Sequence, residues 1–193
     1  MLQNKKIQTQ KNRPWLFKTK VDDYDIFNET LLEYIDISEY ELHSTISKVD
    51  FNLNVNRRPI YHDFVTQGIY SSVVKHATSL LYDLKSMDDI IWETIWFHQY
   101  TNGSYFDWHG HSCTFAFVYY CELPYGNQLT TDFFDVWEKE VFTVDAEVGD
   151  ILIYPSFFFH RSPYNQMNQR KTIFAGNYNI NCGPLGTIES YRG

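Results

Sequence analysis

Short aromatic and β-branched runs fill the chain from residue 90 onward, and they constrain its fold more than any other feature. The runs cover residues 90–100, 114–123, 129–134, 140–144, 150–154 and 171–180. Turn sequences separate them, among them Thr101-Asn102-Gly103 and Glu147-Val148-Gly149. Runs of this length between such turns are typical of strands. Many short strands after a helical start predict a β-sandwich or barrel that is buttressed by helices on one sheet.

The first 88 residues have a different pattern of apolar positions. Apolar positions at helical spacing predict helices over residues 25–48 and 65–86. No repeat and no linker-like composition divides the chain. We therefore expect a single domain over residues 1–193, with a helical N-terminal support (1–88) and a β core (89–182).

Composition and charge narrow the functional classes. Of 193 residues 18% are aromatic, and the net charge is −8. That charge argues against a nucleic-acid partner bound through a general basic surface. The longest apolar stretch, 151–159, is interrupted by Pro155 and Ser156 and is too short to span a bilayer. Three cysteines without a CxxC motif indicate a reducing compartment, so we expect a soluble, cytoplasmic protein with no membrane partner.

Three histidines are candidate metal ligands. In an extended segment Asp107, His109 and His111 would share a face, because alternate side chains of a strand point the same way. His160 follows three phenylalanines, where charging an imidazole is costly, so it should be neutral and free to donate a lone pair. Each pattern alone also fits a polar loop or a core histidine.

An arginine lies ten positions after His160. Arg170 opens the last predicted strand, and its planar guanidinium can bind a carboxylate with two hydrogen bonds. Thr172 shares its face and could add a hydroxyl, whereas Lys171 would project to the opposite face. Three protein ligands leave three metal positions open, two for a bidentate 2-oxo acid and one for dioxygen.

The ordered set of motifs resembles a known family between about Trp96 and Asn179. The matching elements are Phe97-His98-Gln99-Tyr100, Asp107-Trp108-His109-Gly110-His111, Val118-Tyr119-Tyr120, Gly149-Asp150, Tyr154-Pro155-Ser156, His160, Arg170 and Thr172. They look like the 2-oxoglutarate/Fe(II) dioxygenases, in the prolyl-hydroxylase-like branch that includes small oxygenases of bacteria and marine phages. The N-terminal part has no match.

The resemblance implies a fold, a reaction and residue roles. The fold would be a double-stranded β-helix (jelly roll), and the reaction would hydroxylate a C–H bond using Fe(II), 2-oxoglutarate and O2, with ascorbate as an optional reductant. By position His109 and His160 would bind the iron. Arg170 would bind the distal carboxylate of 2-oxoglutarate, while Tyr120, or else Tyr100, matches a tyrosine that hydrogen-bonds this cosubstrate in relatives.

The chain departs from the family pattern at the third ligand. The usual His-x-Asp is His-x-His here, so either His111 replaces the carboxylate or Asp107 binds from the other side; we favour His111. A three-histidine site carries one less negative charge, which would alter the affinity and the redox potential of the iron.

Two other functions fit parts of the pattern. A cupin-like three-histidine enzyme would work without 2-oxoglutarate and would not require Arg170. A jelly-roll structural or binding module would need no convergence of Arg170 with Tyr120. The substrate of an oxygenase would be a peptide, for example a prolyl residue, or a small metabolite. A phage-encoded chain would work in the host cytoplasm, and the sequence does not determine the oligomeric state.

Overall fold

The computed structural model describes residues 13–50, 59–80, 90–124 and 129–180 of the chain. Its elements in chain order are β1 (Phe17–Lys20), α1 (Tyr24–Ile37), β2 (Lys48–Val49), α2 (His62–Leu80), β3 (Ile90–Tyr100), β4 (Phe106–His109), β5 (Phe115–Glu122), β6 (Asp132–Asp135), β7 (Glu140–Thr143), β8 (Asp150–Pro155), β9 (His160–Ser162) and β10 (Lys171–Ile180). Every predicted run overlaps a strand, so the expectation of a mainly β chain with N-terminal helices is confirmed.

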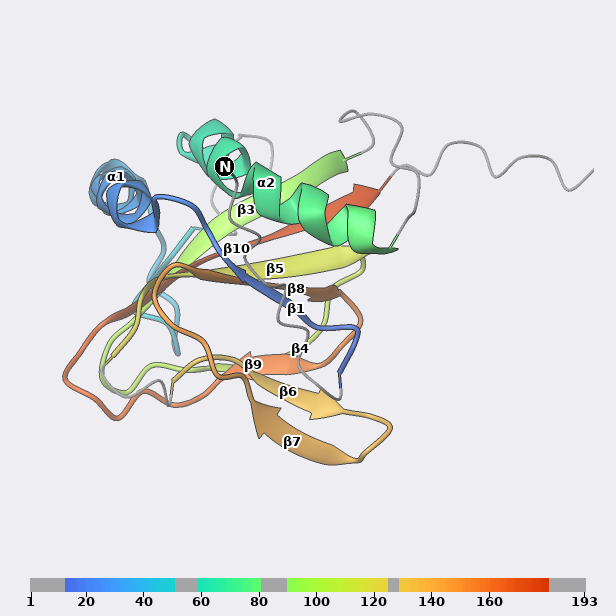
Figure 1. Cartoon of the computed structure of the whole chain (residues 1–193). Helices are drawn as coiled ribbons and strands as arrows, with labels where there is room; N and C mark the ends of the chain where they lie inside the picture. Colours follow the sequence, from blue (N-terminus) through green and yellow to red (C-terminus); the bar gives the residue numbers. More distant parts are fainter. Residues whose placement is uncertain (1–12, 51–58, 81–89, 125–128, 181–193) are drawn as a thin grey trace, which may run out of the picture.

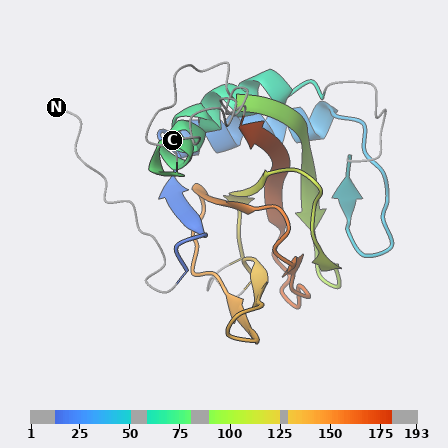
Figure 2. The same cartoon turned by 90° about the vertical axis from the view of Figure 1, so that its right-hand side faces the viewer.

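Two antiparallel sheets form the body of the molecule. The larger has the order β1-β8-β5-β10-β3-β2 and the smaller β4-β9-β6-β7. The helices cover the outer face of the larger sheet, and the smaller sheet lies on its other side (Figures 1 and 2). This arrangement is the expected jelly roll.

The larger sheet is buried on both faces. On β5, Phe117 and Tyr119 point toward the helices, whereas Val118 and Tyr120 point toward the smaller sheet. Two separate apolar cores result, one between helices and sheet and one between the two sheets. A strand that is covered on both faces reads as a continuous apolar run, because neither of its faces has to be polar.

The two helices pack closely against each other and against the larger sheet. The buried stripe of α2 includes Val65, Ile69 and Val73, which recur every four residues as on one helix face. A Cβ on Gly68 would lie 2.2 Å from a ring carbon of Phe27 on α1, so only glycine allows this approach. Neither helix, in the ranges described, is long and apolar enough to span a bilayer.

The predicted helix over residues 25–48 is too long. α1 ends at Ile37 because Ser38 is extended (φ −77°, ψ 144°), although its N–H still binds the carbonyl of Ile35. α2 begins three residues before the prediction, and residues 81–86 of the predicted helix lie outside the described part.

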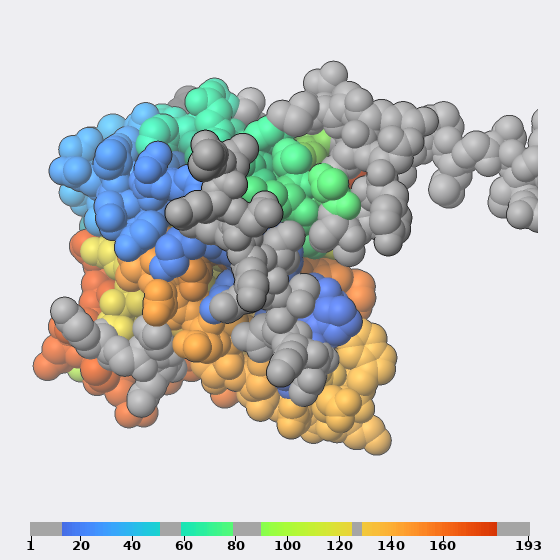
Figure 3. Space-filling model, viewed as in Figure 1, coloured from blue at the N-terminus to red at the C-terminus, as the bar shows by residue number. Residues whose placement is uncertain are grey.

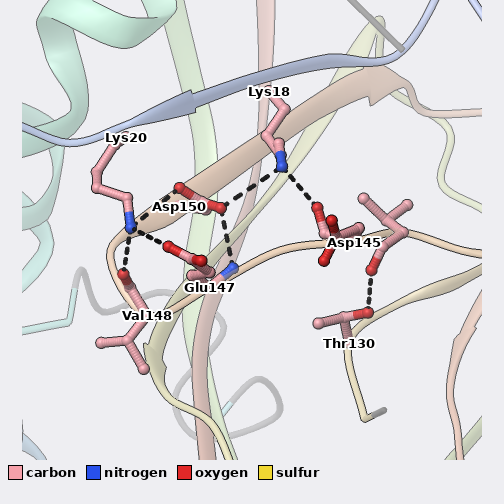
Figure 4. Close-up of polar contacts among 8 residues, drawn as sticks. Lys18, Lys20, Thr130, Asp145, Glu147, Val148 and Asp150 are labelled. Carbon is pink, nitrogen blue, oxygen red and sulfur yellow. Dashed lines mark hydrogen bonds and ion pairs between the residues drawn. The ribbon is translucent and has the colours of Figure 1, made fainter. Parts of the chain in front are cut away.

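The N-terminal region also supplies strands. β1 and β2 form the two edges of the larger sheet. Lys18 and Lys20 of β1 both pair with Asp150 of β8, at 3.8 and 3.5 Å (Figure 4). Just before β1, the Trp15 ring stacks on that of Phe158 with centroids 3.8 Å apart and packs edge-on against Phe133 of β6. In Figure 3 the blue residues near the N-terminus lie next to the orange residues of the smaller sheet. Residues 13–50 therefore brace both sheets.

Candidate metal centre

Two short strands of the smaller sheet bring the predicted histidines together. His109 ends β4 and His160 begins β9, and the two are register partners with ring centroids 4.2 Å apart. The ring of His111 lies 5.2 Å from each of them. One nitrogen of each imidazole lies within 4.8 Å of the others, close enough to bind one metal ion.

Backbone carbonyls orient two of these rings. Nδ1 of His109 lies 2.8 Å from the carbonyl oxygen of Asp107, and Nδ1 of His160 lies 2.9 Å from that of Phe158. A carbonyl can only accept, so each Nδ1 carries the proton and each Nε2 keeps its lone pair. Metal-binding histidines are commonly fixed in this way.

Burial keeps all three imidazoles neutral near pH 7. Desolvation lowers the pKa of His109 and lowers that of His160 well below its ordinary value. The same cause lowers the pKa of His111 to about 4. Neutral imidazoles are the form that binds a metal, so the donor set fits Fe(II), although it would also suit Ni(II), Cu(II) or Zn(II).

Asp107 does not join the cluster. Its side chain is exposed, and its Oδ1 accepts a hydrogen bond from the backbone N–H of Trp108 at 2.8 Å. The His111 side chain is only partly buried, but its backbone N–H donates to the carbonyl of Ser156 at 2.8 Å, which ties its loop to the end of β8. Of the two alternatives for the third ligand, the structure groups His111 with the other histidines.

The three imidazoles line a cavity between the two sheets. Its other walls are Trp96, His98, Tyr100, Phe106, Val118, Thr131, Tyr154, Arg161, Ser162, Lys171, Ile173 and Ala175. Its free volume is about 30 Å³, far below the roughly 300–1,000 Å³ of usual ligand pockets. A ligand of several atoms must therefore move lining side chains as it enters.

Lys171 is the buried cation of this cavity. It is 1% exposed, and its Nζ donates to the carbonyl of Thr130 at 3.1 Å and to Oγ of Ser162 at 2.9 Å. An ammonium has three protons, so one donor remains. Burial lowers the pKa of Lys171 to about 7. Among the described residues no carboxylate forms an ion pair with it, so an anionic ligand would complete its bonding.

Arg170, which we expected to bind the cosubstrate, is paired with a carboxylate of the protein and does not line the cavity. Its guanidinium makes two hydrogen bonds to Glu122, at 2.7 and 2.6 Å, on the side of β10 away from the cavity. Thr172 shares that side, as predicted, and its hydroxyl also donates to Glu122. The sequence could not place these residues, because β10 is buried on both faces and its alternation does not identify the cavity side.

Of the two predicted tyrosines, Tyr100 lies beside Lys171. Tyr100 is the register partner of Lys171, and its ring centroid is 5.1 Å from Nζ. Its hydroxyl lies 2.7 Å from Nδ1 of His98, a buried residue of the cavity wall. Tyr120 points to the same side of the sheet, but its hydroxyl bonds Thr131 at 2.7 Å. Tyr100 therefore borders the cavity directly and Tyr120 acts only through Thr131.

Tyr154 of β8 was not predicted as a site residue. It is fully buried in the cavity wall, and its ring centroid lies 4.9 Å from that of His160. Its hydroxyl has no hydrogen-bond partner among the described residues. A buried hydroxyl without a partner is costly, so this group would bond a ligand in the cavity. It belongs to the Tyr154-Pro155-Ser156 element of the resemblance, but that element gives it no role, and a strand tyrosine is usually a core residue.

Comparisons with known proteins identify the fold. No family model matches the chain, and no curated protein matches its sequence. Among solved structures, a Pseudomonas putida prolyl-4-hydroxylase is 10% identical (TM-score 0.58) over 85% of this chain and 91% of its own. HygX from Streptomyces hygroscopicus, solved with nickel, 2-oxoglutarate and hygromycin B, is 8% identical (TM-score 0.64) over 89% and 84%.

The epimerase SnoN from nogalamycin biosynthesis, described as α-ketoglutarate dependent, is 10% identical. It has a TM-score of 0.64 over 85% of this chain and 77% of its own. At such identities the likeness establishes the architecture and leaves the chemistry to be argued from the residues. The chain has the jelly-roll fold of the 2-oxoglutarate-dependent oxygenases.

Proposed function

We propose that this protein is a non-haem Fe(II)- and 2-oxoglutarate-dependent oxygenase that hydroxylates a C–H bond of a small molecule or of a peptide, such as a prolyl residue. One observation carries the proposal. Three neutral imidazoles converge in the same cavity as a buried lysine that has no carboxylate partner among the described residues.

Each group of the cavity has a task in this proposal. His109, His111 and His160 would hold the iron, and Lys171, not Arg170, would bind the distal carboxylate of 2-oxoglutarate. Bound iron, with 2-oxoglutarate and O2, supplies oxidative decarboxylation to succinate and CO2 coupled to hydroxylation. The apolar residues Ile173, Val118 and Ala175 would exclude water from the bound cosubstrate.

The buried lysine also separates this proposal from its two alternatives. A three-histidine enzyme without 2-oxoglutarate, or a structural jelly roll, has no need for an ammonium enclosed beside the imidazoles. A buried ammonium without a carboxylate partner is costly, and for this reason the pKa of Lys171 falls to about 7. An anionic ligand would hold Lys171 in its charged form. A dicarboxylate that chelates the metal through its other end meets this need.

The direct test compares Lys171→Met with Arg170→Met. Fe(II) and 2-oxoglutarate are added without oxygen and the charge-transfer absorption is titrated; succinate formation is then measured in air. Loss of the partner of a buried charge costs about 2–5 kcal/mol, so Lys171→Met should weaken 2-oxoglutarate binding at least tenfold. Arg170→Met, which alters a surface ion pair, should stay within about twofold.

Two results would contradict the proposal. Equal cosubstrate affinity in wild type and Lys171→Met would remove Lys171 from its role. Wild-type protein that binds Fe(II) through the histidines but neither absorbs nor forms succinate with 2-oxoglutarate would favour the cupin-like alternative.

A further inference from the structure

The walls of the cavity carry no negative charge. Its polar side chains are histidines, hydroxyls, Lys171 and Arg161; none of the described residues that line it is an aspartate or glutamate. Asp107 and Asp132, which adjoin cavity residues in the sequence or by hydrogen bond, bond other groups. Asp107 is exposed and bonds Trp108, and Asp132 bonds Arg161 at 2.9 Å and Thr143 at 2.6 Å.

The charges of these cavity side chains determine the electrostatic surroundings of a bound metal ion. Three neutral imidazoles leave the two positive charges of a divalent ion uncompensated, and Lys171 adds a third whenever it is protonated. Like charges in a poorly hydrated cavity repel far more strongly than in water. In the common two-histidine, one-carboxylate site the protein itself offsets one of these charges.

We propose that the metal and a dianionic cosubstrate bind this cavity as a mutually dependent pair, because the cosubstrate brings the negative charge that His111 does not supply. The proposal rests on the function proposed above and adds how the site is loaded. A dianion that chelates the metal and reaches Lys171 is attracted to both cations. By linkage, the cosubstrate lowers the Kd for the metal by the same factor as the metal lowers the Kd for the cosubstrate.

A cosubstrate that chelates the metal would couple the binding of the two in any such site. The contribution that is specific to this protein is the missing negative charge at position 111. Replacing His111 by aspartate supplies the missing negative charge from the protein. The Kd for the metal alone should then fall, and the factor by which the cosubstrate lowers this Kd should become smaller. Replacing His111 by asparagine removes the imidazole without adding charge and serves as the matched control.

The experiment is calorimetric titration of the full chain with Mn(II), alone and with saturating 2-oxoglutarate. For the wild type we expect the cosubstrate to lower the Kd for Mn(II) by about 10- to 100-fold, within the usual range of coupling between sites. In His111→Asp the Kd for Mn(II) alone should fall about tenfold, and the coupling should drop to a few-fold. His111→Asn should bind Mn(II) more weakly than the wild type and keep the larger coupling.

Further controls separate charge from chelation and from misfolding. Succinate, which cannot chelate through a 2-oxo group, should still tighten Mn(II) binding slightly in the wild type but not in Lys171→Met. His160→Ala lacks one of the proposed metal ligands. The same titration of this variant therefore measures the Mn(II) that 2-oxoglutarate binds in solution, and this heat is subtracted. If His111→Asp melts well below the wild type, His111→Glu provides the same charge with a longer side chain.

Coupling of equal size in the wild type and in the carboxylate variants would overturn the inference. If the wild type still forms succinate from 2-oxoglutarate, only the inference fails and the proposed function stands. If Mn(II) binds in no condition, the metal centre and therefore both proposals fail.

Discussion

Lys171 is fully enclosed, and its burial should make stability depend on pH in a particular direction. Its pKa is lowered to about 7, whereas an unfolded lysine titrates near 10.4. Between these values the unfolded chain holds a proton that the folded, metal-free protein lacks, so stability rises with pH. Relative to Lys171→Met, the wild type should gain about 1 kcal/mol per pH unit from pH 8 to 10, measured by urea unfolding without metal. Parallel pH profiles of the two proteins would show that Lys171 stays protonated when folded.

Tyr154 and Tyr119 form a matched pair of buried tyrosines. The Tyr154 hydroxyl has no partner among the described residues, whereas that of Tyr119 donates to the side chain of Asn28 at 2.5 Å. Tyr154→Phe should leave the metal-free protein as stable, or about 1 kcal/mol more stable, and weaken 2-oxoglutarate binding. Tyr119→Phe should cost about 1 kcal/mol and leave that affinity unchanged. Unfolding and binding titrations of both variants decide this, and unaltered cosubstrate affinity in Tyr154→Phe would exclude a ligand role.

The sequence located the histidines better than the cation that faces them. His109, His111 and His160 were found because their order and spacing are distinctive, and the structure brings them together. Arg170 immediately precedes β10 and Lys171 is its first residue. A shift of one residue in the alternation would exchange which of the two faces the cavity. Helices cover one face of this strand and the smaller sheet covers the other, so its apolar residues gave no hint of orientation.

At the scale of elements, the edge strand β1 depends on one buried carboxylate. Asp150 is 5% exposed; it accepts a hydrogen bond from the N–H of Glu147 at 2.9 Å and pairs with Lys18 and Lys20 (Figure 4). Asp150→Asn removes the charge and leaves two lysines facing each other, which should cost about 1–3 kcal/mol. Glu147→Gln alters only an exposed partner of Lys20 and should cost under about 1 kcal/mol. Urea unfolding measures both, and equal losses would argue against a special role for Asp150.

The long strands were the easiest to predict, although the four-residue strands β6 and β7 were also found. The long strands β3, β5 and β10 have enough residues for their composition to identify them. By contrast β1, β2 and β9 have four, two and three residues, too few for a periodic pattern. Such strands exist because a neighbour's backbone pairs with them, and this information lies elsewhere in the chain.

At the scale of the whole molecule, one apolar core contributes to stability alone, whereas the other also supports the candidate metal centre. Within the described ranges, the core between the helices and the larger sheet contains none of the three candidate metal ligands, whereas the core between the sheets surrounds the histidine cluster. Ile69 of α2 is fully buried in the first core. Phe133 of β6 is fully buried in the second, with its ring centroid 5.8 Å from that of His160 and 4.7 Å from that of Tyr154.

This division predicts that two equally buried truncations have different effects. Ile69→Ala should cost about 2–5 kcal/mol through its cavity, yet the protein that remains folded should bind Mn(II) and 2-oxoglutarate as the wild type does. Phe133→Ala should cost about 3–5 kcal/mol and also weaken both ligands, because the ring that supports His160 and Tyr154 is gone. Lys75→Ala on the exposed side of α2 controls for the helix and should change stability by less than about 0.5 kcal/mol. Urea unfolding measures the stability of each variant, and calorimetry measures ligand binding. Each titration is run 15 °C below the melting temperature of the variant, a margin about as large as the largest shift in melting temperature expected, so that the protein is folded. Weakened ligand binding in Ile69→Ala would mean that the helices position the metal centre through the larger sheet, because the two cores would then not be independent.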